Sequence, residues 1–393
     1  MRIAIICRFL PPAINAVGEY ASHLARALCR KGMRVSLVTS TGRTSEPTEA
    51  MGPVEIHRVV SSWGWAGMSR LAHFLRSQRF DVVHFQFVPQ MYGRWGIALP
   101  AACLPLLLRA RAGPQVLTTC HELLSYRPAG LRNLFLQRLY LLQAFLLLRG
   151  SARLIVPTEW QERLACESFP RYAAKITRIP VGANVLPLGQ EGSALTGSAR
   201  KPATDPLRLG TFGTGHPWWR YEDALIVLKG LRDEGLPVHL VCIGDIAGTH
   251  PTRYQKLRNL ERQLGLTGAV QWTGPIPAHE VSRLLRSVDV FLALQDRGIT
   301  ARSTALMAAF AHGLPIVATD GPLADRWLTD SGALEVVEPG NPASAQAAIS
   351  SLARNPERRR ELADRSRSFY DKNLSWEALS ARILEVTRSL TSP

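Results

Sequence analysis

The chain has 393 residues, of which 46% are hydrophobic and 20% are charged. This length and composition are typical of a globular protein with two ordinary domains, and they exclude a disordered chain. No stretch of ~18 apolar residues is free of charge, so no membrane-spanning helix is expected.

The positive charge is concentrated in the first half of the chain. Residues 1–185 contain 23 Lys and Arg against 9 Asp and Glu, a net charge of +14, whereas residues 186–393 contain 24 against 22, a net charge of +2. A basic half favours an anionic partner such as a membrane surface or a lipid phosphate, although an Arg-rich genome would also raise this count. Nucleic acid is the less favoured partner, because no nucleic-acid motif is present and aromatic residues are not interleaved with basic ones.

The six cysteines show neither a C-x-x-C pair nor a zinc spacing. They are expected to be buried thiols in a reducing compartment. The N-terminal apolar run is too short for a signal peptide and lacks a small-residue cleavage site. The expected location is therefore cytoplasmic, with peripheral docking on the inner membrane face as an option that the basic half leaves open.

The first half alternates short apolar strands with helical patterns. An amphipathic helix over 19–32, closed by Gly32, follows the first strand, and this β-loop-α-β order predicts a parallel sheet. Strands are expected at 2–7, 34–40, 54–60, 81–87, 115–121, 152–158 and 176–182. Two longer apolar segments, 95–112 and 131–150, are interrupted or flanked by Arg. They are interpreted as core helices, with partial dipping into a bilayer face as the alternative.

A polar, low-complexity stretch at 189–206 is interpreted as a linker, after which the pattern restarts. Strands are expected at 207–213, 238–245, 269–274, 288–294, 314–320 and 333–339, and helices at 221–235, 279–287, 355–373 and 375–390. A further short helix begins near Ser303 and ends at Gly313. The prediction is two doubly wound α/β domains, 1–188 and 206–373, followed by a terminal helical segment at 374–393. Ligands in such domains bind outside the carboxyl ends of the strands, so the site is expected in the cleft between the two domains.

The order of short motifs along the chain resembles that of a known family. These motifs include PPAINAVGEYASHLARAL, DVVHFQ, CHEL, ARLIVPTEW, RIPVGAN, LGTFGTGHP, VCIGD and HGLPIVATD. The chain is similar to glycosyltransferase family 4, whose members are retaining sugar-nucleotide transferases with the GT-B fold of two Rossmann-like domains around a cleft. The resemblance covers nearly the whole chain and depends on the ordered set rather than on any one motif.

The resemblance implies a nucleotide-sugar donor held mainly by the second domain and a glycan or lipid-linked acceptor held mainly by the first. It implies no metal ion and no cofactor, and a final helix that crosses back to the first domain. The diphosphate charge would instead be neutralised by basic side chains, backbone N–H groups and a helix N-terminus.

Family members usually carry two Glu, separated by seven residues, that contact the donor. Aligned on HGLP, these positions are Thr300 and Ala308 here, so the ribose contact of the second Glu is lost. The hypothesis is that Asp296 takes over a catalytic sugar contact and Arg302 a phosphate contact. The alternatives are a surface ion pair between Asp296 and Arg302, or a decayed site.

The other expected donor contacts lie at strand ends and at a helix start. Thr214 stands where the family often has Arg, and Arg220 is near the family's second basic position, where its planar fork suits a phosphate. A merely solvated Arg220 is the alternative. The full set of predicted donor-binding residues is Gly213, Arg220, Gly244, Asp245, Thr300, Arg302, Ser303 and Thr304.

In the first domain the resemblance points to His121, which ends a strand and matches a His beside the donor sugar. Glu122 could orient the acceptor, and Gly18 would allow its close approach. Gln86 could bind an acceptor hydroxyl or simply end a core strand. The missing Glu pair also leaves a second function open, that of a catalytically inactive GT-B-like partner or scaffold.

Overall fold

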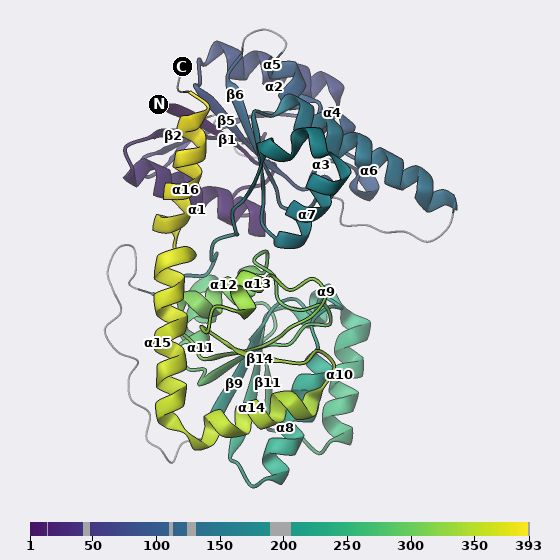
Figure 1. The fold of residues 1–393 in the computed structure, drawn as a ribbon, viewed down its shortest axis with the longest axis vertical. Coiled ribbons are helices and arrows are strands. Elements are labelled where there is room, and N and C mark those ends of the chain that lie inside the picture. The colour runs from purple at the N-terminus through teal and green to yellow at the C-terminus, as the bar shows by residue number, and fades with distance from the viewer. Residues whose placement is uncertain (14, 42–47, 110–112, 124–130, 189–205, 392–393) are drawn as a thin grey trace. The chain divides into compact units, whose positions relative to one another are not determined.

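The structure is a computed structural model, and it describes residues 1–391 except 14, 42–47, 110–112, 124–130 and 189–205 (Figure 1). The chain divides into two compact units: unit 1 contains Met1–Gly182 and Trp376–Pro393, and unit 2 contains Ala183–Ser375. The expected linker at 189–206 lies, apart from its last residue, outside the described residues.

Unit 1 is built on an eight-stranded sheet with the order β3-β4-β2-β1-β5-β6-β7-β8. Seven strands pair in parallel: β1 (Arg2–Ile6), β2 (Arg34–Ser40), β4 (Val54–Val60), β5 (Val82–Phe87), β6 (Gln115–Cys120), β7 (Arg153–Val156) and β8 (Ile176–Arg178). All seven were predicted. The edge strand β3 (Thr48–Met51) was not, and it pairs with β4 in the antiparallel direction.

The helices of unit 1, apart from the last, lie between these strands in the chain. They are α1 (Ala16–Arg30), α2 (Trp65–Ser77), α3 (Pro89–Tyr92), α4 (Leu99–Ala102), α5 (Leu104–Arg109), α6 (Leu131–Gly150), α7 (Glu159–Ser168) and α16 (Trp376–Ser389), with 3-10 turns η1 (Arg94–Gly96) and η2 (Pro170–Lys175). Helix α1 begins three residues earlier than predicted, because the Asn15 side chain accepts hydrogen bonds from the N–H groups of Val17 and Gly18 and so caps the first turn.

The apolar segment 95–112 is not one core helix, because the chain turns through η1 before the short helices α4 and α5. The segment 131–150 does form one helix, α6, but only one face of it is buried. Among the residues that the structure describes, no helix combines the length and the apolarity needed to cross a bilayer.

Helix α16 packs against α1 within unit 1 (Figure 1). Its Trp376 is 4% exposed and lies against the backbone of Gly182, where a Cβ atom would come within 2.5 Å of the indole ring. The ring also stacks on His23 and meets Tyr20, with centroids 5.3 and 5.1 Å away. Only glycine at position 182 leaves room for this contact.

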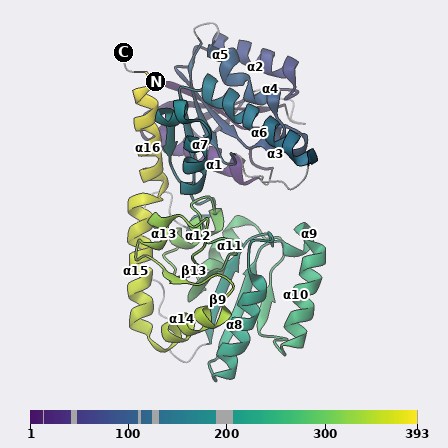
Figure 2. The ribbon, with the colours of Figure 1, turned by 45° about the vertical axis from the view of Figure 1, so that its right-hand side comes forward.

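Unit 2 is built on a six-stranded parallel sheet with the order β11-β10-β9-β12-β13-β14. Two of these strands, β9 and β13, are labelled in Figure 2. All six strands were predicted, and they are β9 (Leu207–Phe212), β10 (Val238–Ile243), β11 (Val270–Trp272), β12 (Val290–Ala293), β13 (Ile316–Thr319) and β14 (Glu335–Val337). The helices are α8 (Tyr221–Asp233), α9 (Ile246–Thr249), α10 (Pro251–Gln263), α11 (Ala278–Leu285), α12 (Thr304–Ala311), α13 (Arg326–Thr329), α14 (Pro342–Arg354) and α15 (Pro356–Asn373).

The six cysteines are all free thiols, as expected, but only Cys7, Cys120 and Cys242 are buried. Burial raises the pKa of Cys7 to about 12. Cys29, Cys103 and Cys166 are half-buried, so the prediction of six buried thiols is wrong for these three.

Each unit contains a histidine that burial keeps neutral. His84 on β5 lies with its Nε2 2.7 Å from the Thr119 hydroxyl, and burial, together with the nearby His121, lowers its pKa to about 3. His312, which follows α12, lies 2.7 Å from the Ala308 carbonyl through Nδ1 and 2.9 Å from the Ser282 hydroxyl through Nε2. Burial lowers its pKa to about 4.

These two histidines predict acid sensitivity. An unfolded His titrates near ~6.5, so below that pH the unfolded state binds more protons than the folded state, and the free energy of unfolding falls on acidification. Between pH 7 and pH 5 we expect a loss of about 2 kcal/mol for each histidine. Urea unfolding at both pH values should show a smaller loss for His84→Gln and for His312→Gln than for the unmodified chain. An unchanged loss in both variants would contradict this assignment.

Candidate active site

Both sheets reverse their strand order beside their first strand. In unit 1 the chain proceeds from β1 toward β2 and then returns to β5, and in unit 2 it proceeds from β9 toward β10 and returns to β12. The carboxyl ends of strands at such a reversal form a crevice, which is the usual ligand site of doubly wound sheets. In unit 2, Arg220 follows β9 and Asp296 follows β12, so these two predicted residues flank the reversal.

Backbone hydrogen bonds hold the loops after β9 and β12 side by side. The Arg220 N–H donates to the Leu294 carbonyl over 2.9 Å, and the Asp296 N–H donates to the Trp218 carbonyl over 3.0 Å. Trp219 also forms an antiparallel bridge with Gln295. The positions of Arg220 and Asp296 are therefore set by the backbone of both loops.

The guanidinium of Arg220 is held between two carboxylates. Its Nε and Nη2 atoms each donate to Asp223 over 2.9 Å, and Nη1 donates to Asp296 Oδ1 over 3.0 Å. Asp223 is 4% exposed. Its hydrogen bonds are the main reason that the pKa of Arg220 is raised above the ordinary value. Arg220 is thus not merely solvated, and Asp296 pairs with it.

Two further cations lie over one aromatic ring in the same loops. The guanidinium carbons of Arg297 and Arg302 lie 5.1 and 5.9 Å from the centroid of the Trp218 ring. Such cation–π contacts orient an Arg without neutralising its charge. Positive charge therefore collects around Trp218, whose carbonyl is bonded to the backbone of Asp296.

The loop from Asp296 to α12 is held by the buried carboxylate of Asp325, whose Oδ2 accepts a 2.6 Å hydrogen bond from the Ala301 N–H. Ser303 is the N-cap of α12, and its hydroxyl accepts from the Leu306 N–H over 3.2 Å. Thr304 is the first residue of this helix, while the Thr300 carbonyl accepts from the Ser303 N–H. The predicted hydroxyl groups therefore gather at the start of α12.

Gly213 and Gly244 meet at the carboxyl ends of β9 and β10. Gly244 has a φ of 115°, and a Cβ atom there would come within 2.3 Å of the Gly213 carbonyl oxygen, so only glycine fits. Its N–H donates to the Thr273 hydroxyl over 3.0 Å. Asp245, the next residue, caps α9 by accepting a 2.7 Å hydrogen bond from the Gly248 N–H. The structure thus gives Gly244 and Asp245 structural roles, and their contact with a donor stays a prediction.

In unit 1 the structure brings His121 and Gln86 together. His121 is 6% exposed, and its Nε2 is hydrogen-bonded to Gln86 Oε1 over 2.9 Å. The edge of its ring meets Tyr20, and its carbonyl accepts from the Gln161 amide over 3.2 Å. The amide nitrogen of Gln86 is buried and finds no hydrogen-bond partner in the described ranges. A buried donor without a partner is costly, and this one adjoins the predicted catalytic histidine.

Gly18, predicted to admit the acceptor, is required by the chain itself. A Cβ atom at this position would lie 2.4 Å from the Phe9 carbonyl oxygen. The close approach is therefore made by the preceding loop, and an acceptor contact at Gly18 stays a prediction. Glu122 follows His121 and is half-buried.

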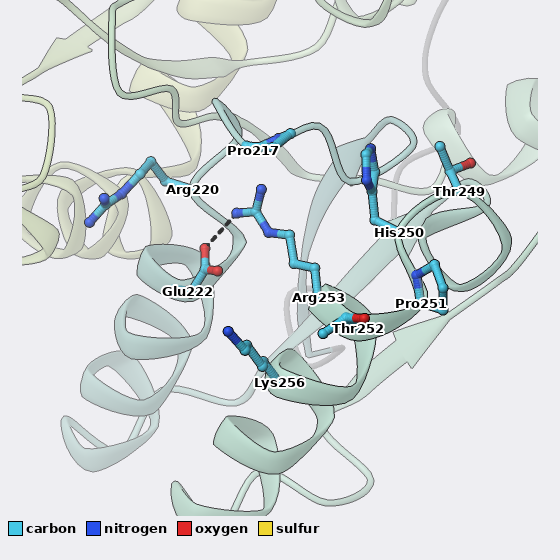
Figure 3. Close-up of a pocket in the computed structure, with 9 residues that line it drawn as sticks. All are labelled: Pro217, Arg220, Glu222, Thr249, His250, Pro251, Thr252, Arg253 and Lys256. Carbon is cyan, nitrogen blue, oxygen red and sulfur yellow. Dashed lines mark hydrogen bonds and ion pairs between the residues drawn. The ribbon is translucent and has the colours of Figure 1, made fainter.

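A pocket of about 620 Å³ lies on the flank of the β9–α8 loop (Figure 3). It is lined by Pro217, Arg220, Glu222, Thr249, His250, Pro251, Thr252, Arg253 and Lys256, so Arg220 is the only predicted donor residue in its wall. Figure 3 shows the Arg220 guanidinium pointing away from Arg253 and Glu222. Arg253 donates to the carbonyls of Gly215, His216 and Trp219 and pairs with Glu222 over 2.8 Å.

Three residues that shape the site were missed at the sequence level. Asp223 fixes the Arg220 side chain. It lies three residues after Arg220 in the first turn of α8, a spacing at which opposite charges can pair, so this contact could have been predicted from the sequence. Arg253 and Asp325 hold loops to which they are not adjacent in sequence, and no local pattern marks them.

Two family models match this chain. Residues 15–182 match the Glycosyl transferase 4-like domain, and residues 200–369 match the Glycosyl transferases group 1 domain. A 245-residue region is 23% identical to D-inositol 3-phosphate glycosyltransferase of Corynebacterium urealyticum. This region spans 60% of the chain but only 56% of that relative.

Solved structures of similar fold cover the chain almost completely. Sucrose-phosphate synthase of Thermosynechococcus elongatus matches with a TM-score of 0.71 at 15% identity, over 99% of this chain and 98% of that one. Anabaena Alr3699/HepE, solved in complex with UDP and glucose, matches with a TM-score of 0.70 at 14% identity, over 99% and 100%. The two Rossmann-like units therefore have the GT-B fold of glycosyltransferases. Because the two family models together span most of its length, the chain belongs to the glycosyltransferases of the family 4 type.

Proposed function

We propose that the protein transfers a sugar from a nucleotide-sugar donor to a glycan or lipid-linked acceptor, with retention at the anomeric carbon and without a metal ion or cofactor. The observation that carries this proposal is the Arg220–Asp296 pair at the strand reversal of unit 2, beside Arg302 and the start of α12. A cation next to an exposed carboxylate, at the carboxyl edge of a parallel sheet, suits a ligand that has both a diphosphate and a sugar.

In the proposed donor complex, Arg220 and Arg302 bind the diphosphate, with Gly213 and the α12 N-terminal residues Ser303 and Thr304 supplying further donors. The leaving nucleotide gains negative charge as the glycosidic bond breaks, and fixed positive groups lower that barrier. Asp296, once its Arg220 contact passes to the phosphate, is left to accept hydrogen bonds from sugar hydroxyls. No step in this scheme requires a divalent cation.

The proposed acceptor side is the His121–Gln86 pair, with Glu122 following in the chain. His121 would hydrogen-bond the donor sugar, and the Gln86 amide nitrogen would donate to an acceptor hydroxyl. The departing phosphate would take the acceptor proton, so that attack occurs on the face the leaving group vacates and the configuration is retained. A lipid-linked acceptor at the inner membrane face agrees with the basic composition of residues 1–185.

A second candidate function is that of an inactive partner or scaffold. It is favoured by one observation: Ala308 is fully buried in α12 and offers no polar group to a ribose. Under the main proposal, the ribose must bind without that carboxylate, which should weaken donor binding but not abolish transfer.

A thermal-shift screen of UDP-, GDP- and ADP-sugars, each with and without EDTA, tests both proposals. A ligand at 100 times its Kd stabilises the folded state by about 2.7 kcal/mol. We expect one nucleotide class to raise Tm equally with and without EDTA, and NMR of the product to show the donor's anomeric configuration. Stabilisation by no nucleotide-sugar, or only with a divalent cation, would contradict the main proposal. Binding without turnover of any acceptor would favour the scaffold.

A further inference from the structure

Helix α6 has an exposed stripe of apolar and basic side chains. Phe135 is 64% exposed and Leu142 is 43% exposed, and Arg138 and Arg149 are exposed as well. Their spacings of three, four and seven residues put all four on one face of the helix. We call these four residues the α6 stripe.

The opposite face of α6 is fixed in the core of unit 1. Gln143, Ala144, Leu147 and Leu148 are buried, and Gln143 Oε1 accepts a 2.7 Å hydrogen bond from the Ala98 N–H. The helix therefore cannot turn its stripe inward without breaking this packing. Figure 1 shows the N-terminal part of α6 extending beyond the neighbouring helices of its unit.

The sequence around the stripe is almost free of negative charge. Residues 82–158 contain eight Arg, no Lys and a single acidic residue, Glu122. Large apolar side chains exposed among arginines, on a helix whose other face is anchored, are typical of helices that lie in a membrane interface. The arginines can reach lipid phosphates while their stems remain along the apolar surface.

We infer that the α6 stripe docks unit 1 onto an anionic lipid bilayer. Phe135 and Leu142 enter the boundary between headgroups and acyl chains, and Arg138 and Arg149 bind lipid phosphates. A second copy of the chain is the less favoured occupant, because pairing this face with itself would bring like charges together. The inference does not depend on the transferase activity, since lipid binding is measured without any sugar substrate.

Vesicle flotation with the full chain tests the inference. We expect recovery with vesicles containing about one-third phosphatidylglycerol and little with pure phosphatidylcholine. The double variant Phe135→Ser/Leu142→Ser should lower the partition coefficient about tenfold, because two apolar side chains no longer enter the interface. Arg138→Gln/Arg149→Gln should lower it about fivefold for each Arg at low salt, and less at high salt.

Matched controls come from unit 2. Ile226 on α8 is 42% exposed and Arg360 on α15 is exposed, so Ile226→Ser and Arg360→Gln remove the same kinds of surface group and should leave flotation unchanged. Three results would overturn the inference: equal binding to neutral vesicles, stripe variants that bind like the unmodified chain, or a dimer that Phe135→Ser/Leu142→Ser dissociates while no lipid is bound.

Discussion

Replacing Arg220 by Gln should lower kcat/KM for the donor by about 100-fold or more, because a fixed charge at the leaving group is among the largest contributions to such catalysis. The guanidinium is oriented by two hydrogen bonds to Asp223 and one to Asp296, so a neutral amide cannot reproduce its charge or its geometry. Steady-state kinetics and calorimetry of nucleotide binding would measure the loss. Arg220→Lys should recover part of it, since the charge returns without the planar fork.

The Arg220 variant needs a control for stability. Asp223 is buried, and removing its partner leaves an unpaired carboxylate, which costs about 3–5 kcal/mol in comparable cases. The double variant Arg220→Gln/Asp223→Asn removes both charges and should regain much of the lost stability while staying inactive. A stable double variant that binds nucleotide as tightly as the unmodified chain would show that Arg220 does not contact the donor.

His121→Ala should reduce kcat by about 100-fold or more with little change in nucleotide affinity. The side chain is held at the end of β6 by Gln86 and Tyr20, whereas the proposed nucleotide contacts belong to unit 2. The expected result is thus a change in turnover rather than in donor binding, measured by kinetics at saturating donor.

Gln86→Leu is the matched control for that variant. It removes the hydrogen bond to His121, together with the unpartnered amide nitrogen, and keeps the histidine. A smaller loss, of about tenfold, is expected if Gln86 acts by orienting His121 and the acceptor. Full activity of His121→Ala would refute its proposed role.

The fold could be predicted because its signals are local. Thirteen of the strands are short apolar runs bounded by turns, and the parallel order follows from the helices between them. The strand β3 escaped prediction because it is a short edge strand, TEAM, without an apolar run. The early start of α1 depends on a side-chain cap by Asn15, which the apolar periodicity does not report.

The candidate site could be predicted only one residue at a time. Arg220, Asp296 and Arg302 were named from the resemblance to the family, Arg220 for the second basic position and the other two for their place near the missing Glu pair. Their partners in the structure follow from how two loops lie together. The pairing of Asp296 with Arg220 depends on backbone bonds between segments about 76 residues apart. Arg253 and Asp325 form hydrogen bonds to loops that are distant from them in the sequence, and no local sequence pattern predicts such contacts.

Asp296 binds the Arg220 guanidinium, so a carboxylate of the protein itself already pairs with this cation. A diphosphate that bound Arg220 would therefore have to displace the Asp296 carboxylate. The apparent affinity for the donor would then be the difference between two ion pairs. Release of the nucleotide product would be assisted, because Asp296 can pair with Arg220 again.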